Sequence, residues 1–198
     1  MTHEADAGVL ATLERQHPPA QAFRRFSQPH WADGALSSRD KHLIAVAVAQ
    51  VTRCGYCIEH HALYARSLGA SLPELLAASY VTAALESLGD SEIHVAGDLA
   101  VTASEPALAD SPIARSRHDF VRSILQDATL SPSLRSVLAA AVAHAREKPQ
   151  WRAAFHAFAL EAGVSPAALE EAYAVAVVIR AGVVYAHTLG IARIFEKS

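Results

Sequence analysis

Apolar residues along most of this chain have the spacing of helices, interrupted by residues that typically start or end a helix. Residues 36–51, LSSRDKHLIAVAVAQV, open with serines that are candidate N-caps ahead of an apolar run. Ser71 is followed three residues later by Glu74, the spacing of a capping box, and Gly69 stands where a helix-ending glycine is expected. Because no segment alternates apolar and polar residues well enough to predict a strand, the pattern predicts an all-α fold.

The helix signals of the first half return 94 positions later, without gaps. Ser131 and Ser165 each precede a proline, so a capping serine stands before a proline at the first helical position. Matching caps and glycines indicate an internal duplication rather than two unrelated helical halves. The matched pairs include Leu36–Ser37 with Leu130–Ser131, Gly69 with Gly163, Ser71 with Ser165, and Leu75 with Leu169.

This duplication predicts two tandem related helical units that pack together as one body. We expect the first unit at residues 22–105 and the second at residues 116–198. Residues 1–21 form an N-terminal segment ahead of the first unit. Residues 106–115 are mostly polar or small and include proline, which is typical of a linker between the units.

The composition narrows the class of protein. A chain of 198 residues with 52% hydrophobic and 19% charged residues is typical of a globular protein with a sizeable core. The net charge of −3 gives no basic surface for nucleic acid. The polar N-terminus does not resemble a signal peptide, and the longest apolar runs are shorter than the roughly 20 residues that cross a bilayer. We therefore expect a cytoplasmic protein without nucleic-acid or membrane partners.

Residues 51–70, VTRCGYCIEHHALYARSLGA, hold both cysteines of the chain, Cys54 and Cys57. If a helix begins at Cys54, a rotation of about 100° per residue places Cys54, Cys57 and His61 on one face. His60 then points to the other side of Cys57 and is expected to be a bystander. The first unit is predicted to be specialised for chemistry, because the second unit has lost this cluster. At the positions equivalent to Cys54, Cys57 and His61, the second unit has Lys148, Trp151 and Phe155.

The expected position of the cysteines favours redox chemistry. The N-terminus of a helix stabilises a thiolate, and a thiolate can attack the O–O bond of a peroxide to give a sulfenic acid. A second cysteine nearby then condenses with the sulfenic acid to a disulfide, which an external thiol must reduce. His61, one turn after Cys57, is placed to share a proton with it.

Two other interpretations of the cluster compete with redox chemistry. Cys54, Cys57, His60 and His61 supply the four ligands that a structural zinc site requires. Adjacent histidines diverge by about 100° on a helix, however, and zinc ligand pairs are normally well separated in sequence. The other alternative is an inert buried cysteine pair. We expect no metal at this cluster.

The residues KHLIAVAVAQVTRCGYCIEHH, 41–61, resemble the core motif of the alkylhydroperoxidase D-like, carboxymuconolactone decarboxylase superfamily. The later stretch IRAGVVYAHT, 179–188, resembles a segment common near the end of family domains. The resemblance is strong over residues 36–88 and extends weakly, through the duplication, to most of the chain. It implies an all-helical alkylhydroperoxidase D-like fold in both units and a homo-oligomer, with a trimer favoured.

The same resemblance implies roles for individual residues. Cys57 matches the peroxidatic cysteine, and Cys54 matches its partner, which donates a proton and forms the disulfide. His61 matches the histidine that assists proton movement. The family motif has a glutamate twelve positions before the first cysteine, where this chain has His42. Because an imidazole can also relay a proton near neutral pH, His42 remains a candidate for that task.

Tyr185 and His187 are candidates for closing a pocket over the cysteines, within the chain or across an oligomer interface. The alternative is that His187 is simply a packed helix residue. The resemblance predicts a thiol-dependent peroxidase or disulfide reductase without haem, flavin or metal. Its substrate would be a small hydroperoxide or the disulfide of a partner peroxiredoxin, and its reductant a lipoylated or thioredoxin-like protein. The alternatives are a cofactor-free decarboxylase or lactone-processing lyase, and a non-enzymatic redox sensor.

Overall fold

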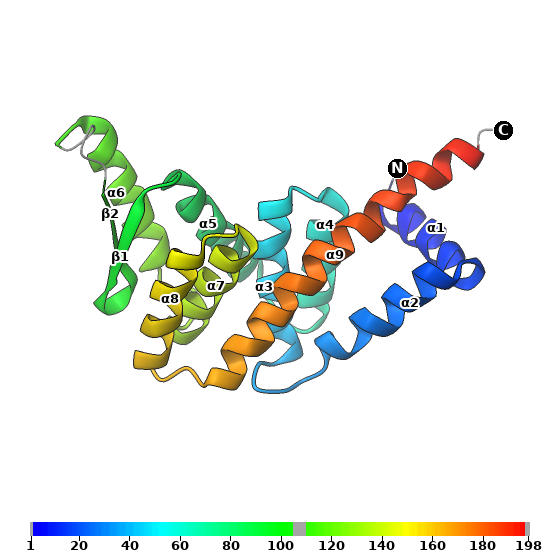
Figure 1. The fold of residues 1–198 in the computed structure, drawn as a ribbon, viewed down its shortest axis with the longest axis horizontal. Helices are drawn as coiled ribbons and strands as arrows, with labels where there is room; N and C mark the ends of the chain where they lie inside the picture. Colours follow the sequence, from blue (N-terminus) through cyan, green and yellow to red (C-terminus); the bar gives the residue numbers. More distant parts are fainter. Residues whose placement is uncertain (1, 105–109, 197–198) are drawn as a thin grey trace.

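The computed structural model describes residues 2–104 and 110–196. The chain is built of helices, with one small hairpin at the end of the molecule farthest from the two termini (Figure 1). The helices are α1 (His3–Gln16), α2 (Pro18–Ser27), α3 (Ser38–Thr52), α4 (Gly55–Ser67), α5 (Leu72–Ser87), α6 (Pro112–Leu125), α7 (Pro132–Ala145), α8 (Pro149–Glu161) and α9 (Pro166–Glu196), with short 3₁₀ turns η1 (Gln28–Trp31) and η2 (Gly97–Leu99).

The order α2–α3–α4–α5 is repeated as α6–α7–α8–α9, and each helix of the second set begins 94 positions after its counterpart. The turns repeat as well. Arg53 and Glu147 both take left-handed conformations, with φ of 55° and 59°, and Gly69 and Gly163 do the same with φ of 91° and 83°. The predicted fold of two tandem related helical units is therefore confirmed in its backbone.

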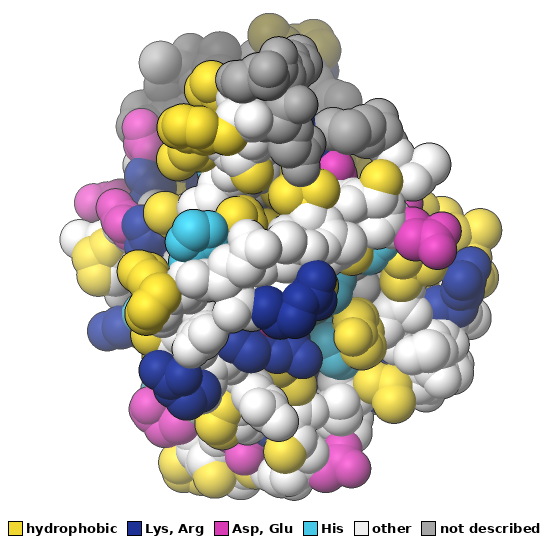
Figure 2. Space-filling model, turned by 90° about the vertical axis from the view of Figure 1, so that its right-hand side faces the viewer, with side chains coloured by type: hydrophobic (Ala, Val, Ile, Leu, Met, Phe, Trp, Pro, Cys, Tyr) yellow, Lys and Arg dark blue, Asp and Glu magenta, His cyan; other side chains and the backbone are white. Residues whose placement is uncertain are grey.

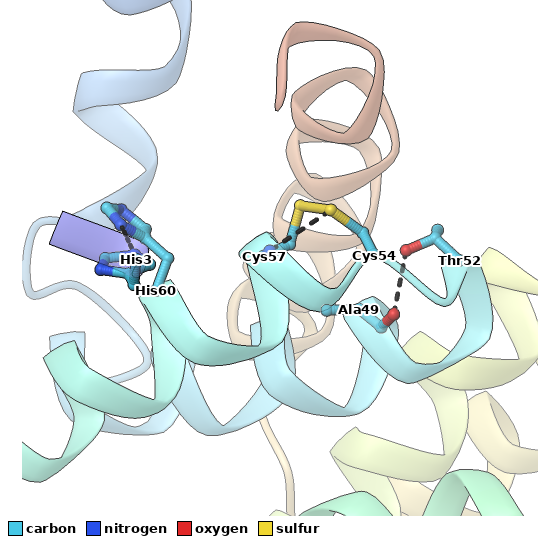
Figure 3. The surroundings of a disulfide bond; sticks show 6 residues. All are labelled: His3, Ala49, Thr52, Cys54, Cys57 and His60. Carbon is cyan, nitrogen blue, oxygen red and sulfur yellow. Dashed lines mark hydrogen bonds between the residues drawn. A yellow bond between two sulfur atoms is a disulfide. The ribbon is translucent and has the colours of Figure 1, made fainter. Parts of the chain in front are cut away.

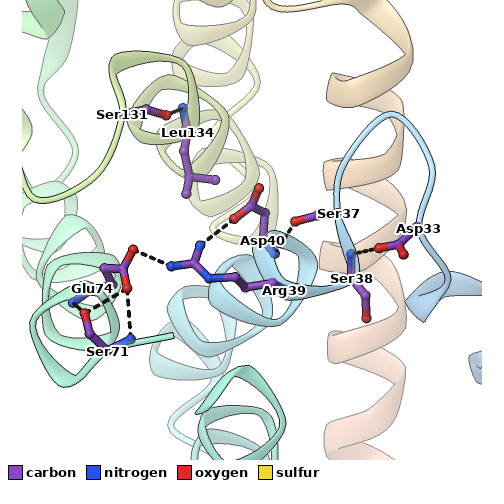
Figure 4. A network of polar contacts seen from close by, with 9 residues as sticks. All are labelled: Asp33, Ser37, Ser38, Arg39, Asp40, Ser71, Glu74, Ser131 and Leu134. Carbon is purple, nitrogen blue, oxygen red and sulfur yellow. Dashed lines mark hydrogen bonds and ion pairs between the residues drawn. The ribbon is translucent and has the colours of Figure 1, made fainter. Parts of the chain in front are cut away.

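Serine caps start the matched helices as the sequence predicted. The Ser37 hydroxyl accepts a hydrogen bond from the Asp40 N–H at 3.1 Å, and the Ser131 hydroxyl accepts one from the Leu134 N–H at 3.2 Å (Figure 4). The capping box forms at Ser71, whose N–H and hydroxyl both donate to the Glu74 carboxylate. Glu74 also pairs with Arg39, which ties α5 to the start of α3.

Buried cations occupy matched positions in the two units. Lys41 on α3 is 4% exposed; its ammonium donates to the Ala32 carbonyl at 2.6 Å and pairs with Glu171 at 3.0 Å. Arg135, 94 positions later on α7, is 5% exposed and donates to the Leu125 carbonyl at 2.5 Å. Each cation thus fixes the loop that leads into its helix, because a buried charge must be paired or hydrogen-bonded.

The helices α3 and α7 form the centre of the core. Residues 43–49 of α3 and 137–143 of α7 are buried on every side, so both helices are apolar all round rather than amphipathic. The long helix α9 packs against both of them. In Figure 1 it runs diagonally across the molecule from the second unit to the region of α1 and α2.

The expectation of no strands was wrong at one place. Strands β1 (Glu92–Ala96) and β2 (Ala100–Ser104) form an antiparallel hairpin in which Glu92 pairs with Ser104 and Ala96 with Ala100. The predicted linker is also partly helical, since α6 begins at Pro112; positions 106–109 of that linker lie outside the described residues. The N-terminal segment forms α1 and the first turn of α2.

The apolar run AYAVAVVI, residues 172–179, is only one part of helix α9, which is continuous over 31 residues. Within the described chain, Pro166–Phe195 is one segment whose length and apolar composition match those of a membrane-spanning helix. Its first half is built into the core, where Leu169, Ala172, Val175 and Ala176 are at most 1% exposed. Its far end exposes Val184, Ile191, Ile194 and Phe195.

Candidate active site

The cysteines lie where one helix ends and the next begins. Arg53, in its left-handed conformation, ends α3, and the Cys54 N–H then donates to the Ala49 carbonyl at 3.3 Å. Cys54 is the N-cap of α4, and its sulfur accepts a hydrogen bond from the Cys57 N–H at 3.3 Å. The two sulfurs are joined as a disulfide across this first helical turn (Figure 3). The helix was predicted to begin at Cys54, so its start is located correctly to within one residue.

The first turn of α4 favours a thiolate in the reduced state. The free N–H groups of a helix N-terminus and its partial positive charge stabilise an anion placed at the N-cap. Cys54 occupies that position and already accepts an N–H. Both cysteines are nearly buried, with Cys54 2% and Cys57 5% exposed. Such a pair can open and close without moving the backbone far.

His42 on α3 and His61 on α4 face each other. Their Nδ1 atoms lie 2.9 Å apart, so one ring donates a hydrogen bond and the other accepts it. Trp31 from η1 covers both rings, with ring centres 4.8 Å from His42 and 4.7 Å from His61. The structure thus brings together the histidine expected from the motif and the histidine that stands in place of its glutamate.

Burial controls the protonation of this pair. It lowers the pKa of His42 to about 4. It also lowers the pKa of His61 well below its ordinary value, and His60 and His42 nearby lower it further. Both rings are therefore neutral at pH 7, and a neutral imidazole pair linked by a hydrogen bond can take a proton at one ring and release one from the other.

A cavity of about 470 Å³ opens beside Cys57 and the two histidines. Its walls come from α1, α2, η1, α3, α4 and α9, so it gathers residues from both ends of the chain. Cys57 lines this cavity, whereas Cys54 is not part of its lining. The lining residues are Ala7, Leu10, Ala11, Glu14, Phe23, Arg24, Ser27, Gln28, Trp31, His42, Tyr56, Cys57, His60, His61, Tyr64, Val178, Ile179, Gly182 and Tyr185.

Of the two residues expected to close a pocket, the structure places one there. Tyr185 lines the cavity, and its hydroxyl donates to the Glu14 carboxylate at 2.6 Å. Burial raises the Tyr185 pKa, so this hydroxyl remains a donor. His187 is exposed and does not line the cavity. Residues two apart on a helix point about 200° away from each other, which is why Tyr185 and His187 cannot share this wall.

His60 was expected to be a bystander, yet it lines the cavity. Its Nδ1 lies 3.3 Å from Nε2 of His3 (Figure 3), and its ring stacks on that of Tyr56 with ring centres 5.5 Å apart. Burial lowers its pKa to about 4. The expectation considered only the face of α4 turned toward the cysteines, and whether His60 takes part in the chemistry stays a prediction. Helix α1 covers the adjacent face and makes it part of the same cavity.

Several lining residues could not be found from the motif. Glu14 and Arg24 come from α1 and α2, and Trp31 comes from η1, all of them before the cysteine motif in sequence. Only the concentration of aromatic residues and histidine around Phe23–Trp31 gave a signal. Within residues 2–104 and 110–196, no His, Cys, Asp and Glu side chains form a group of three or more that could hold a metal ion.

Comparison with known proteins places the chain in a wider context. The carboxymuconolactone decarboxylase family matches it twice, over residues 19–94 and residues 112–193. An 80-residue stretch is 45% identical to "Uncharacterized protein 4 in cox locus" of Paracoccus denitrificans, covering 40% of this chain and 71% of that protein. A search of solved structures gives no match. Each of the two matched segments contains one copy of the repeated helices.

Proposed function

This chain belongs to the carboxymuconolactone decarboxylase family, and on that premise we propose that it is a thiol-dependent peroxidase or disulfide reductase of the alkylhydroperoxidase D-like type. The observation that supports this activity is the Cys54–Cys57 disulfide at the start of α4, with Cys57 lining a cavity beside the neutral pair His42 and His61. A nucleophile, a proton carrier and room for a substrate therefore lie together.

In the proposed reaction the thiolate of reduced Cys57 attacks one oxygen of a hydroperoxide. The O–O bond breaks, the alcohol leaves after taking a proton, and Cys57 becomes a sulfenic acid. The Cys54 thiolate then attacks the Cys57 sulfur, and the hydroxyl group leaves as water once it is protonated. The product is the disulfide of the structure, and an external dithiol reduces it through two exchange steps.

The two histidines are proposed to move the protons of this cycle. His61 takes the proton of the Cys57 thiol, and the His42–His61 hydrogen bond allows a proton to be returned to the leaving alkoxide. His42 would thereby do the work of the glutamate in the family motif. Its lowered pKa keeps the ring neutral at pH 7, so it can still accept a proton.

The burial of the sulfurs supports a proposal about the reductant. With Cys54 2% and Cys57 5% exposed, a slender dithiol such as a lipoyl arm reaches them more readily than a flat protein surface does. A thioredoxin-like donor and a peroxiredoxin partner remain proposals of the same kind. We also propose a cytoplasmic homo-oligomer, with a trimer favoured; the exposed apolar residues at the end of α9 support association.

The test is turnover of a small organic hydroperoxide with a dithiol reductant, by the wild type and by Cys57→Ser. We expect the variant to lose activity by a factor of at least about 10³, because its hydroxyl is a far weaker nucleophile at neutral pH. Trp151→Phe, at the equivalent position of the second unit, is the matched control and should leave turnover unchanged. Equal turnover by wild type and Cys57→Ser would contradict the proposal.

The second candidate is a cofactor-free decarboxylase or lactone-processing lyase. The neutral histidine pair beside a cavity favours it, because such a pair can move protons without any thiol. A lactone substrate separates the two candidates. A lyase would keep its turnover in Cys57→Ser and lose it in His61→Phe, whereas a peroxidase needs both residues. A non-enzymatic sensor would show neither activity but would change its assembly when the disulfide is reduced.

A further inference from the structure

The cavity beside Cys57 carries little charge. Its three histidines are neutral at pH 7, because burial lowers the pKa of each of them. The charged groups among its lining residues are Glu14 on α1 and Arg24 on α2. Glu14 is already engaged, since its carboxylate accepts the Tyr185 hydroxyl at 2.6 Å. The Glu14 carboxylate keeps its negative charge, and the guanidinium of Arg24 is the positively charged group among these lining residues.

Arg24 differs from the buried Arg135, whose guanidinium donates to the Leu125 carbonyl. The Arg24 guanidinium makes no hydrogen bond or ion pair with any other residue in the described part of the chain. Its charge nevertheless acts on the cavity, because it lowers the pKa of His60 and opposes the upward shifts at Tyr56 and Tyr185. An exposed cation that lines a cavity is available to a ligand.

The surroundings of Arg24 are suited to the carbon skeleton of an organic molecule. Phe23, its neighbour on α2, stacks on Tyr185 with ring centres 4.5 Å apart. Both rings line the cysteine cavity and also a larger apolar groove between α1, α2 and the end of α9. Figure 2 views the end of the molecule that holds α1, α2 and the end of α9. It shows Lys and Arg side chains near the middle of this face, with histidine and apolar side chains beside them.

We propose that Arg24 determines the substrate class by binding the carboxylate of an organic hydroperoxide whose peroxide group reaches Cys57. A guanidinium binds a carboxylate through two parallel hydrogen bonds, which orients the molecule as well as attracting it. The aromatic and apolar walls accept the rest of the skeleton. This inference rests on the proposed peroxidase function, and it identifies the substrates as anionic rather than neutral hydroperoxides.

The test compares two probes that differ in one charge, 4-(2-hydroperoxypropan-2-yl)benzoic acid and its methyl ester. For the wild type we expect kcat/KM for the acid to exceed that for the ester about three- to fivefold, since Arg24 is exposed and water screens its charge. Added salt should reduce the preference. Arg24→Gln should bring the ratio close to one, and Arg24→Lys should retain part of it.

Arg25 is the matched control. It is the next residue on α2, it is also exposed, and it does not line the cavity. Arg25→Gln removes the same charge from the protein surface and should preserve the ratio. The inference is overturned if the wild type shows no preference for the acid, or if Arg24→Gln and Arg25→Gln change the ratio alike.

A binding measurement separates this inference from the proposed function. The alcohol product, 4-(2-hydroxypropan-2-yl)benzoate, carries the carboxylate but no peroxide. Its binding can be followed as protection of reduced Cys57 against alkylation. Protection that is lost in Arg24→Gln and kept in Arg25→Gln supports the carboxylate site even when neither probe is turned over, in which case the peroxidase proposal alone fails. Peroxide turnover without Arg24-dependent protection or preference overturns the carboxylate site alone.

Discussion

The starts of α4 and α8 have the same backbone conformation but very different side chains. Each comes after a left-handed residue, Arg53 or Glu147, in the sequence. Each also comes after a helix that holds a buried cation, Lys41 on α3 or Arg135 on α7. The first holds a disulfide and a hydrogen-bonded histidine pair. The second is packed with side chains that have no redox or proton-transfer chemistry. The equivalent residues are Cys54 and Lys148, Cys57 and Trp151, His61 and Phe155, and His42 and Ser136.

The two regions also differ in what covers them. The hairpin covers the second, where the Trp151 indole donates to the Ser91 carbonyl at 2.9 Å and Phe155 is fully buried. In the first, α1 and the extension of α9 take that place and leave a cavity beside Cys57. The repeated helices therefore supply a scaffold, and the unmatched elements decide whether that scaffold encloses a site or a solid core.

Among changes outside the cysteines, the largest effect is expected when the histidine pair of the first unit is replaced by the side chains of the second. His61→Phe should lower peroxide turnover about 10²- to 10⁴-fold, the usual contribution of a positioned acid–base group. The double variant His42→Ser/His61→Phe copies Ser136 and Phe155 fully and avoids leaving one buried imidazole unpaired. Circular dichroism should show that it folds, while stopped-flow measurement shows the loss. A double variant with wild-type turnover would mean that the histidine pair does not act in the reaction.

Acid should destabilise the first unit more than the second. The pKa of His42 is lowered to about 4, so the unfolded chain binds a proton at a higher pH than the folded chain does. Stability is thus complete above about pH 6.5 and falls as the pH drops towards about 4, by up to the order of 3 kcal/mol for this group.

Hydrogen exchange at pH 7.5 and 4.5 can locate this acid sensitivity. Protection should fall more in α3 and α4 than in α7 and α8, because the position of His42 is taken by Ser136 in the second unit. His42→Ser should reduce the difference between the two pH values. Equal loss of protection in both pairs of helices would show that the acid sensitivity arises elsewhere.

A smaller effect on turnover is expected when His42 is replaced by the residue of the family motif. His42→Glu should give equal or faster peroxide turnover, because a carboxylate beside His61 accepts its N–H and makes the imidazole a stronger base. The measurement is kcat/KM with one hydroperoxide, with His42→Ser as the control that removes the group altogether. A large loss in His42→Glu would show that the imidazole at position 42 has a role of its own.

The smallest effect should be the same in both units. Gly69 and Gly163 have φ of 91° and 83°, and a methyl group added at either meets nothing within 4 Å. Alanine at each position should therefore cost only the backbone strain, roughly 1–2 kcal/mol. Urea denaturation of Gly69→Ala and Gly163→Ala checks this. A marked difference between the two losses in the free energy of unfolding would mean that backbone strain alone does not set the cost at both turns.

Much of this architecture could be predicted from sequence because its signals are local. Capping serines and helix-ending glycines act on their own backbone, so Ser71 and Gly69 located helix ends without any knowledge of tertiary structure. The face shared by Cys57 and His61 followed from helical rotation alone. The proximity of His42 to His61 was expected only through the family motif, because it depends on how α3 packs against α4.

The parts that were missed depend on tertiary contacts or on short signals. His60 joins the cavity only because α1 covers it, and no pattern in α4 reports that. The β hairpin did have a weak signal, since Ile93 and Val95 alternate with polar or small residues ahead of Gly97. Strands of five residues are too short for such alternation to stand out in an alanine-rich, helical sequence.

The length of α9 has a consequence for how the molecule comes apart. The start of α9 is part of the core of the second unit, and further along the same helix Val178, Ile179, Gly182 and Tyr185 line the cavity of the first unit. Local opening of α3 and α4 can leave the second unit folded, whereas unfolding of the second unit frees α9 and removes one wall of the cavity. The cavity beside Cys57 therefore depends on the folding of the second unit as well as the first.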